Sequence, residues 1–361
     1  PADTDMRGFV RAVVQEARLR LPMGYAPETI YFGGGTPSML SPTHLGSMIQ
    51  GLRERVDFSQ VKEWSFESNP ATFTEAKVNQ WRELGITRVS LGVQSFEPRL
   101  LQLLGRTHAP DDVEKDIRLL RSAGIPQINI DLMFSLPTQT LSEWSHTLHR
   151  ALELAPDHIS TYNLSYEEDT AFYRQFGSDA GDEETDIAMF EMADDMLTAE
   201  GYRHYEISNY ARPGCRSLHN LACWHGEDYY ALGPGAVGSV AGVRYQNNGD
   251  TAAYIRALNE GMLPPGAAET LRPETRRTEL LGLMLCPDKE AALLFAFLRK
   301  IVLEIPALLL LNWIFPMYGL AYAQLVAEVV LATAAILFLV KIFKDAQAMA
   351  DRTAMENMAR E

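Results

Sequence analysis

An apolar run, Ile30-Tyr31-Phe32, leads directly into three glycines and a Thr-Pro pair, and this junction restricts the possible folds more than any other stretch. Residues 28–32 are predicted to form a short buried strand, and glycines, which lack Cβ atoms, let backbone N–H groups approach a ligand closely. A helix is expected to begin near Pro42. We therefore expect a strand, a glycine loop and a helix, with a ligand at the carboxyl end of the strand.

The same strand and helix pattern repeats along the chain. Further strands are predicted at 63–67, 88–91, 127–132 and 158–164, with helices at 74–84, 111–123 and 141–154 between them. Repeated βα units predict an α/β fold with a parallel sheet and a ligand site at the carboxyl ends of its strands. We expect a partial TIM-like (β/α) barrel, with a doubly wound sheet as the alternative. Beyond it we expect a helix at 182–200, a strand at 202–210 and loops with short strands at 212–245, then helices at 251–258 and 273–285.

Net charge indicates the class of binding partner, and cysteine content indicates the cellular compartment. The 361 residues carry a formal net charge of −15 without a block of Lys or Arg, which argues against a nucleic-acid partner and favours a small ligand. The three cysteines, Cys215, Cys223 and Cys286, lack paired spacing and no secretory signal precedes them. This pattern indicates the reducing cytoplasm.

Four polar residues stand at or just beyond strand ends or a helix stop on the same predicted face: Glu67, Gln94, Arg106 and Asp131. Such a set suits a ligand with an amino group, a carboxylate and a ribose. Glu67 and Asp131 would accept hydrogen bonds from ammonium or hydroxyl groups, Arg106 would hold the carboxylate, and Gln94 would both donate and accept. The alternative for any one of them is an ordinary solvated side chain.

Several blocks occur in a fixed order along the chain: Gly33-Gly34-Gly35-Thr36-Pro37-Ser38, Glu67-x-Asn69-Pro70, residues 88–96, Leu104-Gly105-Arg106-Thr107-His108, residues 129–133, Leu136-Pro137-x-Gln139-Thr140, residues 205–209, His219-Asn220 and Trp224. Together they resemble the oxygen-independent coproporphyrinogen III oxidase family of radical SAM proteins, and within it the HemW heme chaperone branch. The resemblance covers roughly residues 5–285.

The resemblance implies a partial or complete (β/α) barrel with S-adenosylmethionine (SAM) across its strand ends. It implies that Gly34, Gly35 and Thr36 meet the methionine amino group and that Glu67, Gln94, Arg106 and Asp131 line the rest of the pocket. It also implies that His219 is a candidate heme contact, the alternative being a hydrogen-bonded loop histidine.

Three departures from the family pattern concern its cofactors. The family's [4Fe-4S] cluster needs a C-x3-C-x2-C loop, and none of the three cysteines has that spacing, so no catalytic or metal-ligating residue is predicted. We expect an N-terminal truncation that removes this loop and the first barrel strand upstream of Pro1. Cys223 stands where the family's His-Asn-x-x-Tyr-Trp has Tyr, and Val237 stands where Gly-x-Gly-Ala-His has His.

The last part of the chain differs in composition. Residues 301–320 and 322–340 are each long and apolar enough to cross a bilayer, which predicts a membrane hairpin and membrane association through 301–340. The alternative is a pair of apolar core helices. The run also resembles the last helices of multidrug and toxin extrusion (MATE) transporters, which suggests a foreign tail.

These observations divide the chain into a radical SAM barrel core at 1–170, a HemW-type α+β region at 171–286 and the tail at 287–361. The leading hypothesis is a SAM-binding protein of the HemW type, a heme chaperone that lacks its cluster ligands and is inactive as a radical enzyme. The alternatives are a membrane-anchored, non-catalytic heme carrier and a chimeric fragment without activity.

Overall fold

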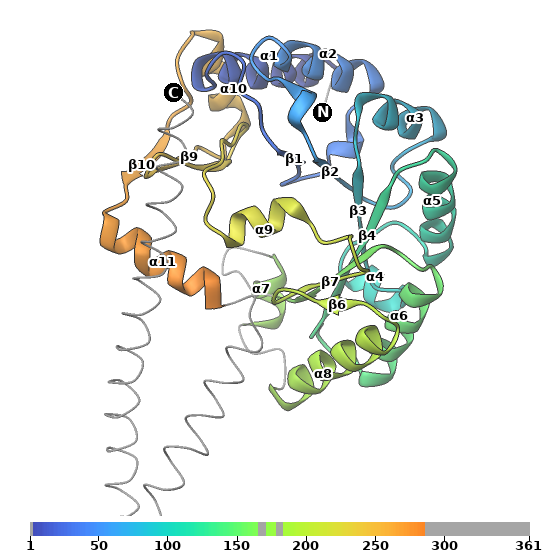
Figure 1. The fold of residues 1–361 in the computed structure, drawn as a ribbon. Coiled ribbons are helices and arrows are strands. Elements are labelled where there is room, and N and C mark those ends of the chain that lie inside the picture. The colour runs from blue at the N-terminus through green and yellow to red at the C-terminus, as the bar shows by residue number, and fades with distance from the viewer. Residues whose placement is uncertain (1–2, 165–170, 178–182, 286–361) are drawn as a thin grey trace, which may run out of the picture. The chain divides into compact units, whose positions relative to one another are not determined.

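A computed structural model of the chain describes residues 3–164, 171–177 and 183–285 (Figure 1). Its main sheet has seven strands in the order β1-β2-β3-β4-β5-β7-β6. The first five are parallel, in chain order: Thr29–Phe32 (β1), Glu63–Ser68 (β2), Arg88–Gln94 (β3), Gln127–Phe134 (β4) and His158–Asn163 (β5). The predicted partial TIM-like barrel is confirmed, and the sequential strand order excludes the doubly wound alternative.

Helices connect the parallel strands. Asp3–Arg20 (α1) precedes β1, and Pro42–Leu52 (α2), Glu75–Leu84 (α3), Pro98–Leu103 (α4), Pro110–Ser122 (α5) and Leu141–Glu153 (α6) follow in the crossovers. Local sequence explains where they begin: the Ser41 side chain caps α2, and Thr140 with Glu143 forms a capping box on α6. In Figure 1 α2, α3, α5 and α6 follow the outer side of the sheet.

The core lies between the sheet and these outer helices. Alternate residues of the parallel strands are apolar and at most 2% exposed: Trp64, Phe66, Val89, Leu91, Ile128, Ile130, Leu132 and Ile159. Since side chains alternate between the two faces of a strand, this set forms one continuous apolar face. Burial of each such side chain contributes roughly 1.5–3 kcal/mol, so the outer face holds the barrel wall together.

The predicted single strand at 202–210 is wrong in its extent. Two short strands, Arg203–His204 (β6) and Asn209–Ala211 (β7), pair antiparallel, and β7 pairs antiparallel with β5. The chain turns between them because the backbone N–H of Asn209 bonds to the carbonyl of Glu206 instead of continuing a strand. Ala171–Phe176 (α7) and Glu183–Ala199 (α8) precede this hairpin, and α8 buries Met189, as its helical spacing predicts.

The predicted loops at 212–245 contain a helix, Leu218–Trp224 (α9), which the prediction missed. Its start is explained by Ser217, whose hydroxyl accepts the N–H of Asn220 as an N-cap. A second, antiparallel sheet has the order β10-β9-β8, from Val237–Val240 (β8), Val243–Asn247 (β9) and Gly266–Thr270 (β10). Thr251–Asn259 (α10) and Pro273–Leu285 (α11) match the predicted helices.

The predicted tail, 287–361, with its membrane hairpin at 301–340, lies outside the described residues. Within the segments that are described, the search for a helix both long and apolar enough to span a bilayer found none.

Two leucines of α6 test whether the outer helices hold the sheet. Leu148 is fully buried and Leu141 is 40% exposed, so the same substitution samples two environments on one helix. Leu148→Ala should lower the free energy of unfolding by about 2–5 kcal/mol, because it leaves a cavity in the core. Leu141→Ala should lower the free energy of unfolding by less than half of that amount. Equal losses in urea unfolding would contradict the packing described here.

Candidate functional site

The inner face of the parallel strands is polar, although parallel sheets are usually apolar on both faces. The alternate residues that point away from the outer core include Glu63 and Glu67 on β2, Arg88 on β3, Asn129 on β4 and Ser160 on β5. All of these side chains but Glu63 line a cavity of ≈ 400 Å³, together with other residues of the same strands. Glu63 lies beside the cavity, where it bonds to the lining residue Ser217. The inner face of the open barrel therefore suits a polar or charged ligand.

The structure brings most of the predicted site residues together at this cavity. Its lining includes Gly35, Glu67, Gln94, Arg106 and Asp131. Gly34 and Thr36 are not in the lining, yet both hydrogen bond to residues that are. His219 lies on α9 and also contacts a lining residue. The four strand-end side chains thus face one shared space.

The glycine loop hydrogen bonds to the side chain of Glu67. The N–H of Gly34 donates to Glu67 Oε2 at 3.1 Å, and the hydroxyl of Tyr31 donates to Glu67 Oε1. Gly33 makes room for both contacts, because a Cβ at that position would lie 2.6 Å from Glu67 Oε1. Gly34 has a φ of 75°, which favours glycine. The glycines therefore shape the carboxylate environment as well as the loop.

Arg106 is held at the cavity by a short chain of polar contacts. Its Nη1 donates to Asn69 Oδ1 at 2.8 Å, and Asn69 Nδ2 donates to Thr36 Oγ1 at 3.2 Å. Burial lowers the pKa of Arg106, but a guanidinium keeps its charge at neutral pH even so. The remaining N–H groups of its fork suit a carboxylate, which binds a guanidinium in a bidentate manner.

Asp131 lies in a cluster of neutral hydrogen-bond donors. Ser90 Oγ donates to Asp131 Oδ2 at 2.8 Å, and Asn129 Nδ2 donates to Oδ1 at 2.7 Å. Burial, with a smaller contribution from the Glu67 carboxylate, raises the pKa of Asp131 to about 6 against the opposing effect of these donors. A ligand hydroxyl that donated to Asp131 would favour its ionised form.

Gln94 lies beside Gly92 at the end of β3 with an unusual backbone. Its φ is 68°, which is uncommon for a residue with a side chain, and the β3–β4 register shifts between Leu91 and Gln94. A Cβ on Gly92 would approach Gln94 Nε2 to 3.2 Å and Asn69 Oδ1 to 3.0 Å. Strained backbone of this kind clusters at ligand sites, where surrounding contacts enforce it.

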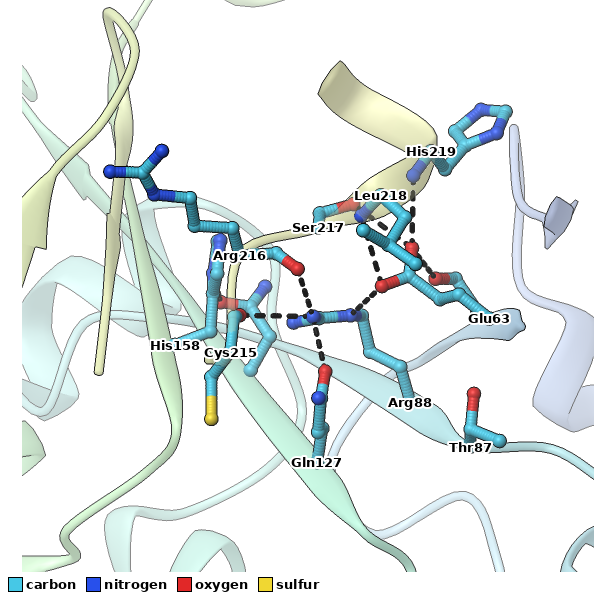
Figure 2. A network of polar contacts seen from close by, with 12 residues as sticks. Glu63, Thr87, Arg88, Gln127, His158, Cys215, Arg216, Ser217, Leu218 and His219 are labelled. Atoms are coloured by element: carbon cyan, nitrogen blue, oxygen red, sulfur yellow. Dashed lines mark hydrogen bonds and ion pairs between the residues drawn. The ribbon is translucent and has the colours of Figure 1, made fainter. Parts of the chain in front are cut away.

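Sequence reasoning missed a buried ion pair beside the cavity (Figure 2). Arg88 Nε donates to Glu63 Oε2 at 3.1 Å, and the two side chains are only 4% and 5% exposed. Arg88 Nη2 also donates to the backbone carbonyls of Cys215 and Arg216, each at 3.0 Å, and to Gln127. A buried ion pair is tolerated when extra hydrogen bonds satisfy most of its polar atoms, and Arg88 Nη1 is the one atom of this pair without a partner among the described residues.

Glu63 in turn fixes the start of α9. Its carboxylate accepts the N–H of Leu218 and the N–H of His219, each at 3.1 Å, and the hydroxyl of Ser217 at 3.2 Å. A negative charge at a helix N-terminus is favourable because it meets unpaired N–H groups and the positive end of the dipole. The barrel wall therefore places α9, and Figure 2 shows the ring of His219 turned away from this network.

The ring of His219 packs on the cavity wall. It stacks on Tyr31 with centroids 4.7 Å apart and an interplanar angle of 11°, and its Nδ1 lies 3.4 Å from Thr29 Oγ1. Burial lowers its pKa, which favours neutral imidazole, the form that ligates iron. Cys223 Sγ lies 3.9 Å from Nε2 on the next helical turn.

A second histidine, His158, was also missed. Its Nδ1 donates to Asn129 Oδ1 at 2.7 Å, and its Nε2 accepts from the Tyr205 hydroxyl at 2.7 Å. Burial holds its pKa well below the usual range, so the ring is neutral and part of the cavity floor. The alternation of polar and apolar residues along β2–β5 was the signal that could have identified this floor.

The structure describes two of the three cysteines. Cys215 and Cys223 are free, and Cys286 lies outside the described residues. Within 3–164, 171–177 and 183–285, no three His, Cys, Asp or Glu side chains gather to hold a metal ion.

Comparisons with known proteins identify the family of this chain. The model of the radical SAM superfamily matches residues 9–151. The chain is 34% identical to the heme chaperone HemW of Synechocystis over 284 residues, which cover 77% of this chain and 69% of that protein. The chain belongs to the HemW family of radical SAM proteins. It is also 37% identical to HemW of Lactococcus lactis, over 63% of this chain and 61% of that relative.

A solved structure shows the same fold. Coproporphyrinogen III oxidase (HemN) from Escherichia coli superposes with a TM-score of 0.69 at 23% identity, over 85% of this chain and 76% of that one. The chain spans 55–69% of the length of the HemW relatives it matches. Their names describe whole proteins, of which this chain corresponds to a part.

Arg88 provides a direct test of the buried pair. Arg88→Met should lower the free energy of unfolding by about 3–5 kcal/mol, because it leaves the Glu63 carboxylate buried without its partner. Arg118→Met is the matched control: Arg118 pairs with Glu114 on the exposed side of α5, where such pairs are worth about 0–1 kcal/mol. Denaturant unfolding of both variants measures the difference, and similar losses would show that the Arg88–Glu63 pair is not structural.

Proposed function

We propose that this chain binds SAM in the barrel cavity and forms the SAM-binding part of a heme chaperone. The observation that carries the proposal is that Glu67, Gln94, Arg106 and Asp131 line one cavity beside the glycine loop. A ligand with an ammonium group, a carboxylate and a ribose matches this donor and acceptor set. The cavity, ≈ 400 Å³, is within the usual range for a cofactor site.

Each group has an assigned partner in this proposal. Gly34, Gly35 and Thr36 meet the methionine amino group, and Arg106 holds the carboxylate. Glu67 and Asp131 accept from ammonium and hydroxyl groups of the ligand, and Gln94 donates and accepts at the nucleoside. The support is that Arg106 is positioned by Asn69 and that Asp131 is surrounded by neutral donors, so both already face the cavity.

The radical SAM family implies a [4Fe-4S] cluster in addition to SAM. The described cysteines do not fit it, because Cys215 lies in the loop before α9, Cys223 lies on α9, and no third metal-ligating side chain joins them among the described residues. We therefore propose SAM and heme binding and derive no step through the cluster.

Heme is the proposed cargo, with His219 as its contact. The support comes from the HemW relatives, which are named heme chaperones, and from the neutral imidazole on α9 beside the cavity. In this proposal residues 1–170 supply the SAM core and 171–286 the heme-contacting region. The tail at 287–361 has no assigned role.

The SAM assignment is tested by Arg106→Ala. Loss of a charge-assisted contact worth about 1.5–3 kcal/mol should weaken SAM binding by roughly 10–100-fold in isothermal titration calorimetry of the full chain. Arg118→Ala, which removes an exposed arginine that does not line the cavity, is the control and should bind like the wild type. Wild-type protein that folds cooperatively but fails to bind SAM would refute the proposal.

The heme assignment is tested by His219→Ala. Removal of the imidazole should weaken heme binding by tenfold or more in a Soret titration, since an iron–nitrogen bond is lost. His149→Ala, on the exposed side of α6, is the matched control. Equal Soret spectra and affinities for His219→Ala and wild type would exclude His219 as the contact.

A further inference from the structure

Tyr31 links the two proposed ligand positions. Its hydroxyl donates to Glu67 Oε1 in the cavity, and its ring stacks on His219 at a centroid distance of 4.7 Å. No motif in the sequence singles out this tyrosine, because it reads as an ordinary residue of a short strand. The structure places it between the carboxylate assigned to SAM and the imidazole assigned to heme.

The imidazole side of this link is held in place. The N–H of His219 donates to Glu63 Oε1 at 3.1 Å, and Glu63 is fixed by Arg88. The backbone of α9 is therefore anchored to the barrel wall. What orients the ring itself is the face of Tyr31 and the contact of Nδ1 with Thr29 Oγ1 at 3.4 Å. A displaced Tyr31 would leave the ring with less support.

The Tyr31 side is more accessible. Among the described strands β1 lies at the edge of the main sheet, and Tyr31 is 41% exposed. Its ring lies against Gly33, where a Cβ would overlap it. The hydroxyl contact with Glu67 and the stack on His219 hold the side chain from two sides, so loss of one contact weakens the other.

We propose that Tyr31 is a positioning residue through which SAM at Glu67 and heme at His219 oppose each other. This inference rests on the function proposed above. Glu67 Oε2 already accepts from Gly34, so a ligand ammonium that reaches this carboxylate competes with the Tyr31 hydroxyl for Oε1. Tyr31 then leaves Glu67, and the His219 ring loses the stack that holds it for iron.

Thermodynamic linkage makes the effect reciprocal. If SAM lowers the affinity for heme by a given factor, heme lowers the affinity for SAM by the same factor. Couplings of this kind are typically about 5–150-fold. A chaperone with this link would hold heme when the SAM site is empty and loosen it when SAM binds.

The experiment is a double titration of the full chain with hemin and SAM. Heme affinity is read from the Soret band at zero and saturating SAM, and SAM affinity by calorimetry with and without hemin. Wild-type protein should bind heme at least about fivefold more weakly when SAM is present. The imidazole resonance of His219 in NMR spectra should also shift on SAM addition.

Two variants separate the parts of the link. Tyr31→Phe keeps the ring and removes the hydroxyl, so Glu67 no longer bonds to residue 31. This variant should bind SAM at least as tightly as the wild type. The effect of SAM on heme affinity should vanish. Tyr31→Leu also removes the stack and should weaken heme binding. Tyr25→Phe is the matched control, since Tyr25 packs on Tyr230 and does not line the cavity.

The outcomes distinguish the two proposals. If SAM and heme both bind wild type but neither alters the affinity for the other, or if Tyr31→Phe keeps the coupling, the role of Tyr31 is refuted while the proposed function stands. If SAM does not bind wild type at all, the proposed function fails and this inference fails with it.

Discussion

The two-residue alternation along β2–β5 is the constraint from which the rest of this structure follows. One set of side chains is apolar and fills the space under the helices, while the other set is polar and faces inward. A barrel interior usually forms part of the packed core. Here the outer face alone supplies that core, which leaves the inner face free to carry a charged and hydrogen-bonding cavity.

A polar interior is stable only if its buried groups are paired. Arg88 and Glu63 form an ion pair. Arg88 also donates to two backbone carbonyls just before α9, and Glu63 accepts a backbone N–H at the start of α9. His158 stays neutral between Asn129 and Tyr205. These contacts connect β2–β5 to residues 205–219, which lie far away in the sequence. The hydrogen bonds that stabilise the buried polar groups therefore also position α9, the helix that carries His219. The stability of the interior and the geometry of the site depend on the same contacts.

Sequence reasoning predicted the five parallel strands, their sequential order and that Glu67, Gln94, Arg106 and Asp131 lie at one shared site. Those predictions succeeded because glycines, helix caps and strand-end polar residues are local signals. Arg88, Glu63 and His158 were missed because their partners come from distant segments. The helix α9 was missed because its N-terminal carboxylate, Glu63, comes from a strand about 155 residues earlier. Tyr31 gave no local signal, since its importance depends on the spatial meeting of β1, β2 and α9.

We propose that the polar inner face converges on one SAM pocket. A crystal structure of the full chain soaked with SAM would show where the ligand lies. We expect electron density for the ligand within hydrogen-bond distance of Glu67, Arg106 and Asp131, with the methionine end at Gly34 and Gly35. Density at another surface of the protein, or a bound ligand that leaves these side chains without a contact, would refute this proposal.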